Sequence, residues 1–193
     1  RKEPVGGAGR TPGRGAAADP LDDEVWDRLL RNTERAAERV RSAGFEPTFH
    51  HHAGTFVESP GEIDRFLAET DVSLTLDTGH LVIAGGDPLA AVTRWGDRLN
   101  HLHLKDIDLA VLRGVIAAGG GMREVWSSGA FVAFGRGDVD LAAVMTSVDA
   151  NGFDGWIVVE QDVLNADDVS IADFQAERAA DQRRNREALR PWA

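Results

Sequence analysis

Short apolar stretches of this chain end in acidic or imidazole side chains. The stretch Ser73–Leu76 ends in Asp77, which is followed by Thr78, Gly79 and His80. Because side chains alternate along a strand, the two leucines of this stretch would face one side of a sheet and Asp77 the other, polar side. An aspartate in this position is either an ordinary turn former or a group that holds a metal ion or a proton. Repetition of the arrangement elsewhere in the chain favours the second interpretation.

Three further predicted strands carry a comparable side chain on their polar face. They are residues 45–52 with His50 or His52, residues 99–106 with His103, and residues 156–161 with Glu160. Two carboxylates and two imidazoles that converge from separate strands suit a divalent cation. The chain has no cysteine, which leaves His, Asp and Glu as the metal-ligating side chains. The sequence therefore predicts a site for a divalent cation, with Mn²⁺ or Co²⁺ favoured and Zn²⁺, Fe²⁺ and Mg²⁺ as alternatives.

Helical and strand patterns alternate along the chain and define its fold class. Apolar residues recur at helical spacing over residues 22–43, and further helices are predicted to begin near Ser59, Asp87 and Asp140 and to span residues 168–190. Strands separated by helices in this way form a parallel sheet. Each strand has one polar face, as in the inner wall of a barrel, whereas strands of a doubly wound sheet are apolar on both faces.

Four strands cannot close a barrel of this type. The sequence therefore predicts an α/β fold that is the C-terminal half, about four β/α units, of a (β/α)₈ TIM barrel, with the N-terminal half missing. Residues 21–193 would form this partial barrel after a flexible, glycine- and arginine-rich lead-in over residues 1–20. Residues 107–137 are expected to be a loop insertion with a helix near residues 109–118.

Composition narrows the kinds of partner that the chain is expected to have. The 193 residues carry a formal charge of −11, and no basic run is interleaved with aromatic residues, so nucleic acid is not an expected partner. No apolar run approaches the length of a membrane span, and no signal segment opens the chain. We expect a small-molecule polyol or sugar substrate, a cytoplasmic location, and either a homo-oligomer or pairing with a missing N-terminal half.

Six ordered motifs carry a resemblance to a known family. They are Phe49–Thr55, Leu76–His80, Ala84–Pro88, His101–Asp106, Gly135–Asp140 and Val158–Asp162. Together they resemble the xylose-isomerase-like TIM barrel superfamily and, within it, the inosose dehydratases of myo-inositol catabolism. The resemblance implies a single divalent metal ion held by Asp77, His103 and Glu160. Many members of the superfamily carry a glutamate where this chain has three histidines, so the fourth ligand is either His50, the first choice, or His52.

The resemblance also implies a reaction. A divalent-metal-dependent dehydratase would remove water from a polyhydroxy ketone, 2-keto-myo-inositol, through a metal-stabilised enediolate. Glu160 is expected to serve as a base as well as a ligand, with Lys105 and His52 as the other catalytic groups. The residues expected to bind substrate are His80, His101, Asp106 and Arg136. Lys105 also has a structural interpretation, as the ion-pair partner of Asp106 or Glu160.

Two other functions are compatible with the same residues. A metal-dependent isomerase or epimerase of a sugar or sugar phosphate would use the same enediolate and differ only in where the proton returns. The related epimerases use two glutamates as acid and base, however, and the second is not evident here. The other alternative is a truncated, inactive half-barrel that acts as a binding or structural protein.

Overall fold

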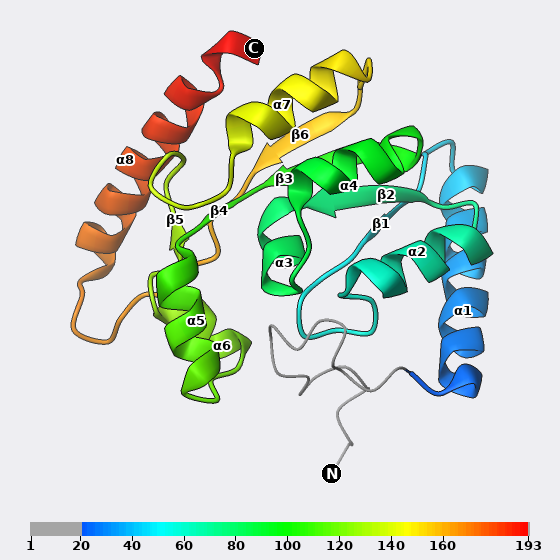
Figure 1. The fold of residues 1–193 in the computed structure, drawn as a ribbon, viewed down its shortest axis with the longest axis horizontal. Coiled ribbons are helices and arrows are strands. Elements are labelled where there is room, and N and C mark those ends of the chain that lie inside the picture. The colour runs from blue at the N-terminus through cyan, green and yellow to red at the C-terminus, as the bar shows by residue number, and fades with distance from the viewer. Residues whose placement is uncertain (1–20, 193) are drawn as a thin grey trace.

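The computed structural model describes residues 21–192, which form a four-stranded parallel sheet and a small antiparallel two-stranded sheet, flanked by helices (Figure 1). The predicted lead-in over residues 1–20 lies outside the described residues. In chain order the elements are α1 (Asp23–Ser42), β1 (Thr48–His50), α2 (Pro60–Glu69), β2 (Ser73–Asp77), α3 (Thr78–Ile83), α4 (Pro88–Trp95), the 3₁₀ helix η2 (Gly96–Arg98), β3 (Leu99–Leu104), β4 (Asp106–Ile107), α5 (Leu109–Ala117), α6 (Met122–Ser127), β5 (Phe131–Val132), α7 (Leu141–Ala150), β6 (Trp156–Val159), α8 (Ile171–Ala188) and the 3₁₀ helix η3 (Arg190–Trp192).

Local signals account for the two N-terminal helices. The Asp22 carboxylate accepts the backbone N–H of Glu24 at 2.8 Å and so begins α1, as the helical pattern predicts. At the start of α2, near the predicted position, Ser59 and Glu62 form a capping box, in which each side chain accepts the other residue's backbone N–H. Proline at the first helical position of α2 removes an N–H that would otherwise have no partner within the helix.

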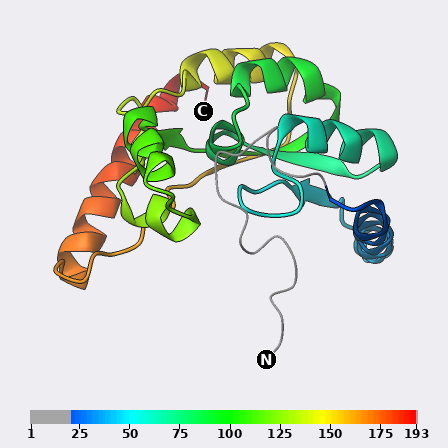
Figure 2. The same ribbon diagram turned by 60° about the horizontal axis from the view of Figure 1, so that its bottom comes forward.

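The main sheet has the strand order β1-β2-β3-β6, and all its pairs are parallel, as predicted. Its apolar face carries Leu74, Leu76, Leu102 and Leu104, which are all fully buried. Side chains from α2, α4 and α7 pack against these leucines, and the helices follow the outside of the sheet in an arc from α1 to α8 (Figure 2). The opposite face of the sheet is therefore left to the polar side chains.

The register of the sheet brings the predicted site residues into line. Asp77 on β2 is the direct neighbour of His103 on β3, and His103 is the neighbour of Val158 on β6. Glu160 follows β6 by one residue and donates its backbone N–H to the carbonyl of Leu104 at 3.1 Å. Because parallel strands end at the same edge of a sheet, these side chains meet at the carboxyl-terminal edge.

Three elements differ from the predictions. The turn expected after Asp77 is the start of helix α3, because the Asp77 carboxylate accepts the backbone N–H of His80 at 2.9 Å and caps that helix. The strand expected over residues 45–52 is limited to β1, since the chain turns back where His52 donates its N–H to the Val57 carbonyl. The insertion over residues 107–137 is better ordered than a loop, with α5, α6 and the antiparallel pair β4–β5.

No helix within residues 21–192 combines the length and apolar character needed to cross a bilayer.

Candidate metal centre

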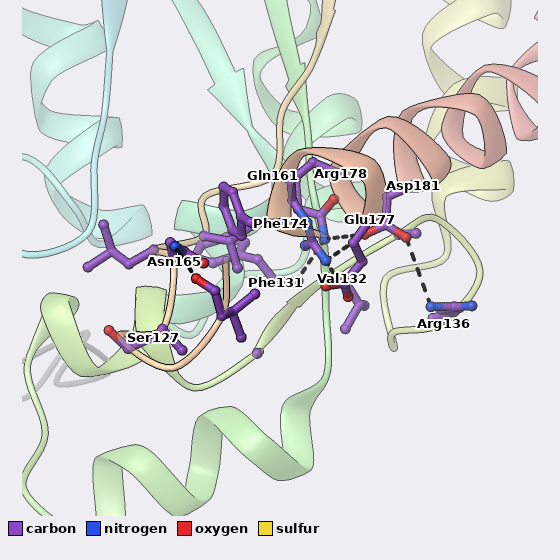
Figure 3. Close-up of a pocket in the computed structure, with 16 residues that line it drawn as sticks. Ser127, Phe131, Val132, Arg136, Gln161, Asn165, Phe174, Glu177, Arg178 and Asp181 are labelled. Carbon is purple, nitrogen blue, oxygen red and sulfur yellow. Dashed lines mark hydrogen bonds and ion pairs between the residues drawn. The ribbon is translucent and has the colours of Figure 1, made fainter. Parts of the chain in front are cut away.

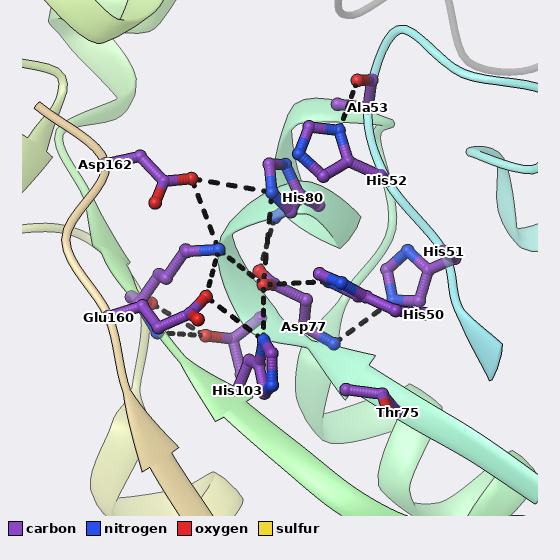
Figure 4. Close-up of polar contacts among 12 residues, drawn as sticks. His50, His51, His52, Ala53, Thr75, Asp77, His80, His103, Glu160 and Asp162 are labelled. Carbon is purple, nitrogen blue, oxygen red and sulfur yellow. Dashed lines mark hydrogen bonds and ion pairs between the residues drawn. The ribbon is translucent and has the colours of Figure 1, made fainter. Parts of the chain in front are cut away.

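Asp77 lies at the centre of a cluster of charged and imidazole side chains (Figure 4). It is fully buried, and its two carboxylate oxygens have different roles. Oδ1 caps α3, whereas Oδ2 lies 3.3 Å from His50 Nε2, 3.6 Å from His103 Nδ1 and 2.6 Å from Lys105 Nζ. Burial opposes ionisation of Asp77, but the contacts with His103, His50 and Lys105 outweigh it and hold its pKa well below the usual range. One residue is thus both a helix cap and an ionised group that faces the site.

His51 holds the backbone of Asp77 in place. Its ring is fully buried, and Nε2 accepts the backbone N–H of Asp77 at 3.2 Å. Burial lowers the pKa of His51 to about 3, so that the ring is neutral and can accept this hydrogen bond. His51 therefore has a structural role beside the site.

His103 and Glu160 form the second part of the cluster. His103 Nδ1 lies 3.0 Å from Glu160 Oε2. Burial would lower the pKa of His103, but the contacts with Asp77 and Glu160 outweigh it and raise this pKa to about 9. The contact with His103, assisted by Lys105, lowers the pKa of Glu160 to about 2 although burial opposes the shift. Glu160 is therefore ionised at neutral pH, as a ligand of a metal cation needs to be.

Lys105 carries a buried ammonium group surrounded by carboxylates. Its Nζ lies 2.6 Å from Asp77 Oδ2, 2.7 Å from Glu160 Oε2 and 3.3 Å from Asp162 Oδ2. Burial lowers the pKa of Lys105, but the three carboxylates outweigh burial and raise it above the usual value. Of the two interpretations of Lys105 as an ion-pair partner, the structure supports Glu160 and not Asp106.

His52 and His80 lie on one side of this cluster with their rings in contact, the centroids 3.5 Å apart and the ring planes tilted by 36°. His80 is 1% exposed, and its Nε2 lies 3.5 Å from Asp162 Oδ2 and 4.0 Å from Asp77 Oδ2. Burial lowers the pKa of His80 to about 2 and also lowers that of His52. Both rings are therefore neutral at pH 7.

The donors fit a divalent cation. Two sets of side chains in residues 21–192 bring one ligand atom each to within 4.8 Å of one another, and they share Asp77: one adds His50 and His80, the other His103 and Glu160. The buried ring nitrogens of His80 and the Nδ1 of His103 make no aligned hydrogen bond with any described residue, although carboxylates lie nearby. These ring nitrogens, with loss of the His103 proton on metal binding, and the ionised carboxylates match the mixed nitrogen and oxygen preference of Mn²⁺, Co²⁺, Fe²⁺ and Zn²⁺.

Comparison with known proteins identifies the family of this chain. The family described as "Xylose isomerase-like TIM barrel" matches residues 6–191. The chain belongs to this family. Its α/β fold with a parallel sheet is of the TIM-barrel type, and the acidic and imidazole side chains stand where barrels of this type place their reactive groups, at the carboxyl ends of the strands.

The curated relatives of this chain include inosose dehydratases and a rhizopine catabolism protein. The chain is 38% identical over 152 residues to an inosose dehydratase of Lacticaseibacillus casei, an alignment that covers 72% of this chain and 47% of the relative. It is 35% identical over 164 residues to the rhizopine catabolism protein MocC of Rhizobium meliloti, covering 83% of this chain and 50% of the relative. The chain thus spans about half the length of the curated relatives that it matches.

Solved structures share the fold at lower identity. A xylose isomerase domain protein from Planctomyces limnophilus superposes with a TM-score of 0.64 at 20% identity, covering 86% of this chain and 53% of that one. The probable 3-DHS dehydratase AsbF from Bacillus anthracis gives a TM-score of 0.63 at 18% identity, covering 87% and 61%. At identities this low, the likeness concerns the fold of the family and not the activity.

Three predicted substrate-binding residues of this family member lie outside the cluster. Asp106 is buried, and its carboxylate accepts four backbone N–H groups, those of Ile107, Gly135, Gly137 and Val139. The carboxylate therefore holds the turn after β5 and has no capacity left for a substrate. His101 lies two residues before His103 on β3, with ring centroids 5.8 Å apart.

Arg136, the third of these residues, lies at a different pocket (Figure 3). That pocket has a volume of about 240 Å³ and is lined by β5, the segment after β6 and α8. The Arg136 guanidinium is largely exposed and lies 3.9 Å from Asp181 on α8. A direct role of Arg136 beside Asp77 is therefore not supported by its position.

The sequence did not predict a role at the site for two residues, one in the cluster and one packed against it. Asp162 contacts both Lys105 and His80, and its position two residues after Glu160 was the signal available in the sequence. Gly79 leaves room for the stem of Lys105, because a Cβ atom at residue 79 would lie 2.7 Å from Lys105 Cβ. Nothing local in the sequence distinguishes this glycine from an ordinary turn glycine.

Proposed function

We propose that this chain carries the metal site of a divalent-metal-dependent dehydratase that removes water from a polyhydroxy ketone such as 2-keto-myo-inositol. The observation that carries the proposal is the convergence of Asp77, His103 and Glu160 from β2, β3 and the end of β6. The names of the curated relatives support a dehydration reaction and an inositol-derived substrate.

Asp77, His103 and Glu160 would hold one divalent ion, with His50 as the fourth ligand. His50 is preferred to His52 because His50 Nε2 lies 3.3 Å from Asp77 Oδ2, whereas His52 Nδ1 is engaged with the Ala53 carbonyl at 2.8 Å. Imidazole and carboxylate together favour Mn²⁺ or Co²⁺ among the candidates. When bound, the ion would supply a Lewis acid for the substrate carbonyl and so acidify the neighbouring C–H group.

His52 has the properties of the proton acceptor. The contact with the Ala53 carbonyl assigns the ring proton to Nδ1, which leaves a lone pair on Nε2. Burial lowers the pKa of His52, so the ring is neutral and able to accept the proton from the carbon next to the carbonyl. Glu160 is the weaker base of the two, because its pKa of about 2 favours the ionised form so strongly.

Lys105 has the properties of a donor to substrate oxygens. Its ammonium has three N–H groups and a raised pKa, so it stays charged and can orient a hydroxyl while that hydroxyl leaves. In the net reaction a C–H and a C–O bond break, a C=C bond forms, and the hydroxyl group leaves as water. His80 is too deeply buried to meet the substrate first, and it would support His52 through ring contact.

The reaction can be tested with 2-keto-myo-inositol and Mn²⁺ by following the absorbance of the dione product. We expect His52→Gln to lower turnover about 100-fold without loss of metal binding, because proton transfer is lost and the ligands are kept. Ketohexose epimerisation without dione formation would instead support the isomerase or epimerase alternative. Metal binding without either reaction would support an inactive half-barrel.

We also propose that the chain is the second half of an eight-stranded barrel. The strands at the two edges of the sheet, β1 and β6, each have one neighbour in the described sheet, and Trp156 on β6 is 74% exposed. The unmatched half of the relatives' length is enough for the four further strands of such a barrel and the helices that connect them. An open edge next to an exposed aromatic side chain favours addition of further strands.

The count of helices argues against closure by a second copy. Within residues 21–192, α1 precedes β1 on the outer arc, and α2, α4, α7 and α8 follow β1, β2, β3 and β6 there, whereas a closed barrel has one such outer helix per strand. In a barrel made of two copies, α8 of one copy and α1 of the other would have to occupy the same position on the outside of the barrel. A complement with one strand more than it has helices avoids this conflict, and we propose that this complement closes the barrel.

Co-purification with the first half of the Lacticaseibacillus casei inosose dehydratase tests this architecture. We expect a one-to-one complex, measured by light scattering, that slows hydrogen exchange at β1 and β6. A stable homodimer with slow exchange at both edges would contradict the proposal.

A further inference from the structure

The ammonium of Lys105 occupies the oxygens that the proposed metal site would use. Its Nζ lies 2.6 Å from Asp77 Oδ2 and 2.7 Å from Glu160 Oε2. The same two oxygens face His103 Nδ1, at 3.6 Å and 3.0 Å. An ammonium group and a divalent cation on one pair of oxygens repel each other at short range in a buried site, where screening is weak. The two cations therefore compete.

Asp162 offers Lys105 another anionic partner. Its Oδ2 lies 3.3 Å from Lys105 Nζ, and its side chain is 29% exposed, so part of it lies at the open side of the cluster. Asp162 belongs to neither set of side chains whose ligand atoms converge for one ion. It is the third carboxylate around the ammonium and the one that metal binding would leave free.

The stem of Lys105 is held in place, so that only the end of the side chain has to turn. The backbone N–H of Lys105 donates to Thr78 Oγ1 at 2.8 Å, and Thr78 Oγ1 donates to the carbonyl of Lys105 at 2.7 Å. The stem packs against Gly79, where a Cβ atom would lie 3.0 Å from Lys105 Cδ. A turn of the terminal bonds would move the ammonium away from Asp77 and Glu160 and closer to Asp162.

We propose that Lys105 is an internal competitor of the divalent cation and that Asp162 is a positioning residue, which receives the ammonium when Asp77 and Glu160 bind the ion. This inference rests on the proposed metal site. Lys105 stays charged throughout, and its role is to neutralise the buried carboxylates before the ion arrives. Asp162 stabilises the ammonium of Lys105 after it has left the other two carboxylates.

The dissociation constant for Mn²⁺, measured from the electron paramagnetic resonance signal of the free ion, tests the inference without any assay of activity. We expect Lys105→Met to tighten Mn²⁺ binding about tenfold and Asp162→Asn to weaken it about tenfold. In the K105M background, Asp162→Asn should have little effect, because no ammonium remains to be received. Asp168→Asn is the matched control, since it removes an exposed carboxylate from the same segment after β6 and should bind Mn²⁺ as the unaltered chain does.

Three results would overturn the inference. Unchanged or weaker Mn²⁺ binding by K105M would show that Lys105 does not compete. If Asp162→Asn weakens Mn²⁺ binding equally in the unaltered chain and in K105M, Asp162 acts as a ligand or through its charge alone. Absence of Mn²⁺ binding by the unaltered chain and all variants would remove the metal site itself, which is a failure of the proposed function that the first two results do not produce.

A second variant protects the test against misfolding. Lys105→Arg keeps the positive charge, and we expect it to bind Mn²⁺ no more tightly than the unaltered chain. Circular dichroism of each metal-free variant establishes that it is folded before titration. If K105M does not fold, tight binding by Lys105→Arg would overturn the inference, and weak binding by Asp162→Asn relative to Asp168→Asn would support it.

Discussion

At the scale of single residues, the two oxygens of Asp77 explain how one side chain serves both structure and site. Oδ1 caps α3 through the N–H of His80, and Oδ2 meets Lys105, His50 and His103. A helix cap needs only an acceptor, which an amide can provide, whereas the ion pair with Lys105 needs the negative charge, and a carboxylate is a stronger ligand of a divalent cation than an amide is. The two roles can therefore be separated by one substitution.

Asp77→Asn should keep the cap of α3 and lose the charge. We expect the metal-free protein to lose about 3 kcal/mol of stability, because the buried ammonium of Lys105 loses a partner. The rise in Tm on addition of Mn²⁺ should also disappear, since a ligand that binds only the folded state stabilises it by mass action.

Asp140→Asn is the control for this measurement. Asp140 caps α7 by accepting the N–H of Ala143 at 2.9 Å, and it lies outside the cluster. This variant should keep the Mn²⁺-dependent rise in Tm. An equal Mn²⁺ response from Asp77→Asn would contradict a ligand role for Asp77.

The pKa of His103 predicts how stability depends on pH. In the folded, metal-free chain it is raised from 6.5 to about 9, because Asp77 and Glu160 outweigh burial. The contribution of these contacts is thus fully present below pH 6.5 and is lost as the pH rises through about 9. The stability difference between the unaltered chain and His103→Gln, measured by chemical unfolding, should therefore be larger at pH 6 than at pH 9.5.

His101 provides a control of opposite sign. Burial lowers the pKa of His101, so its protonation favours the unfolded chain as the pH falls. The loss of stability caused by His101→Gln should consequently be smallest at low pH. A pH dependence of the same sign for both variants would contradict the assignment of the effect to the His103 contacts.

At the scale of elements, α3 explains why a glycine follows the site aspartate by two residues. The helix begins directly after β2, which places its first turn against the neighbouring strand end at Lys105. Thr78 binds both backbone polar groups of Lys105, so the approach is close. A residue without a Cβ atom is needed at the next position.

Gly79→Ala should destabilise the fold even though alanine is the better helix former. The added Cβ atom would lie 2.7 Å from Lys105 Cβ and 3.0 Å from Phe131 Cε1, so that the stem of Lys105 has to shift. We expect a loss of about 2 kcal/mol in thermal or chemical unfolding. Gly61→Ala in α2 is the matched control, because its Cβ atom would meet no atom within 4 Å and should be neutral or stabilising. Equal effects at both sites would contradict the packing argument.

At the scale of the whole molecule, the central strands of the main sheet are paired on both sides, whereas each edge strand is paired on one side. The central strands β2 and β3 each have two hydrogen-bonded neighbours, and their leucines are fully buried. The edge strands β1 and β6 have one neighbour each, and the approach to β1 carries Phe45 with 71% exposure. Backbone groups at such an edge are open to water or to a further strand.

Hydrogen exchange of the isolated chain should reflect this difference. We expect amides of residues 156–159 to exchange faster than those of residues 73–77 and 99–104, because edge strands open at a lower free-energy cost than central ones. Mass spectrometry of peptides from these segments provides the measurement. Protection of β6 equal to that of β3 would mean that the edge is already covered in solution.

The sequence alone determined the features that depend on neighbouring residues. The caps and periodicity of α1 and α2 are short-range signals, and the alternation along the strands placed Asp77, His103 and Glu160 on one face. These predictions succeed because hydrogen bonds within a turn and the two-residue repeat of a strand do not depend on the rest of the fold.

Only the tertiary structure decided which polar groups meet. Asp162 contacts Lys105. The carboxylate of Asp106 instead accepts backbone N–H groups of a turn, and Arg136 lies at another pocket. The start of α3 at Asp77 was also hidden, because a capping aspartate and a turn aspartate look alike in sequence. Such contacts join residues far apart in the chain, and the path of the loops and the register of the strands fix them through packing that no local pattern encodes.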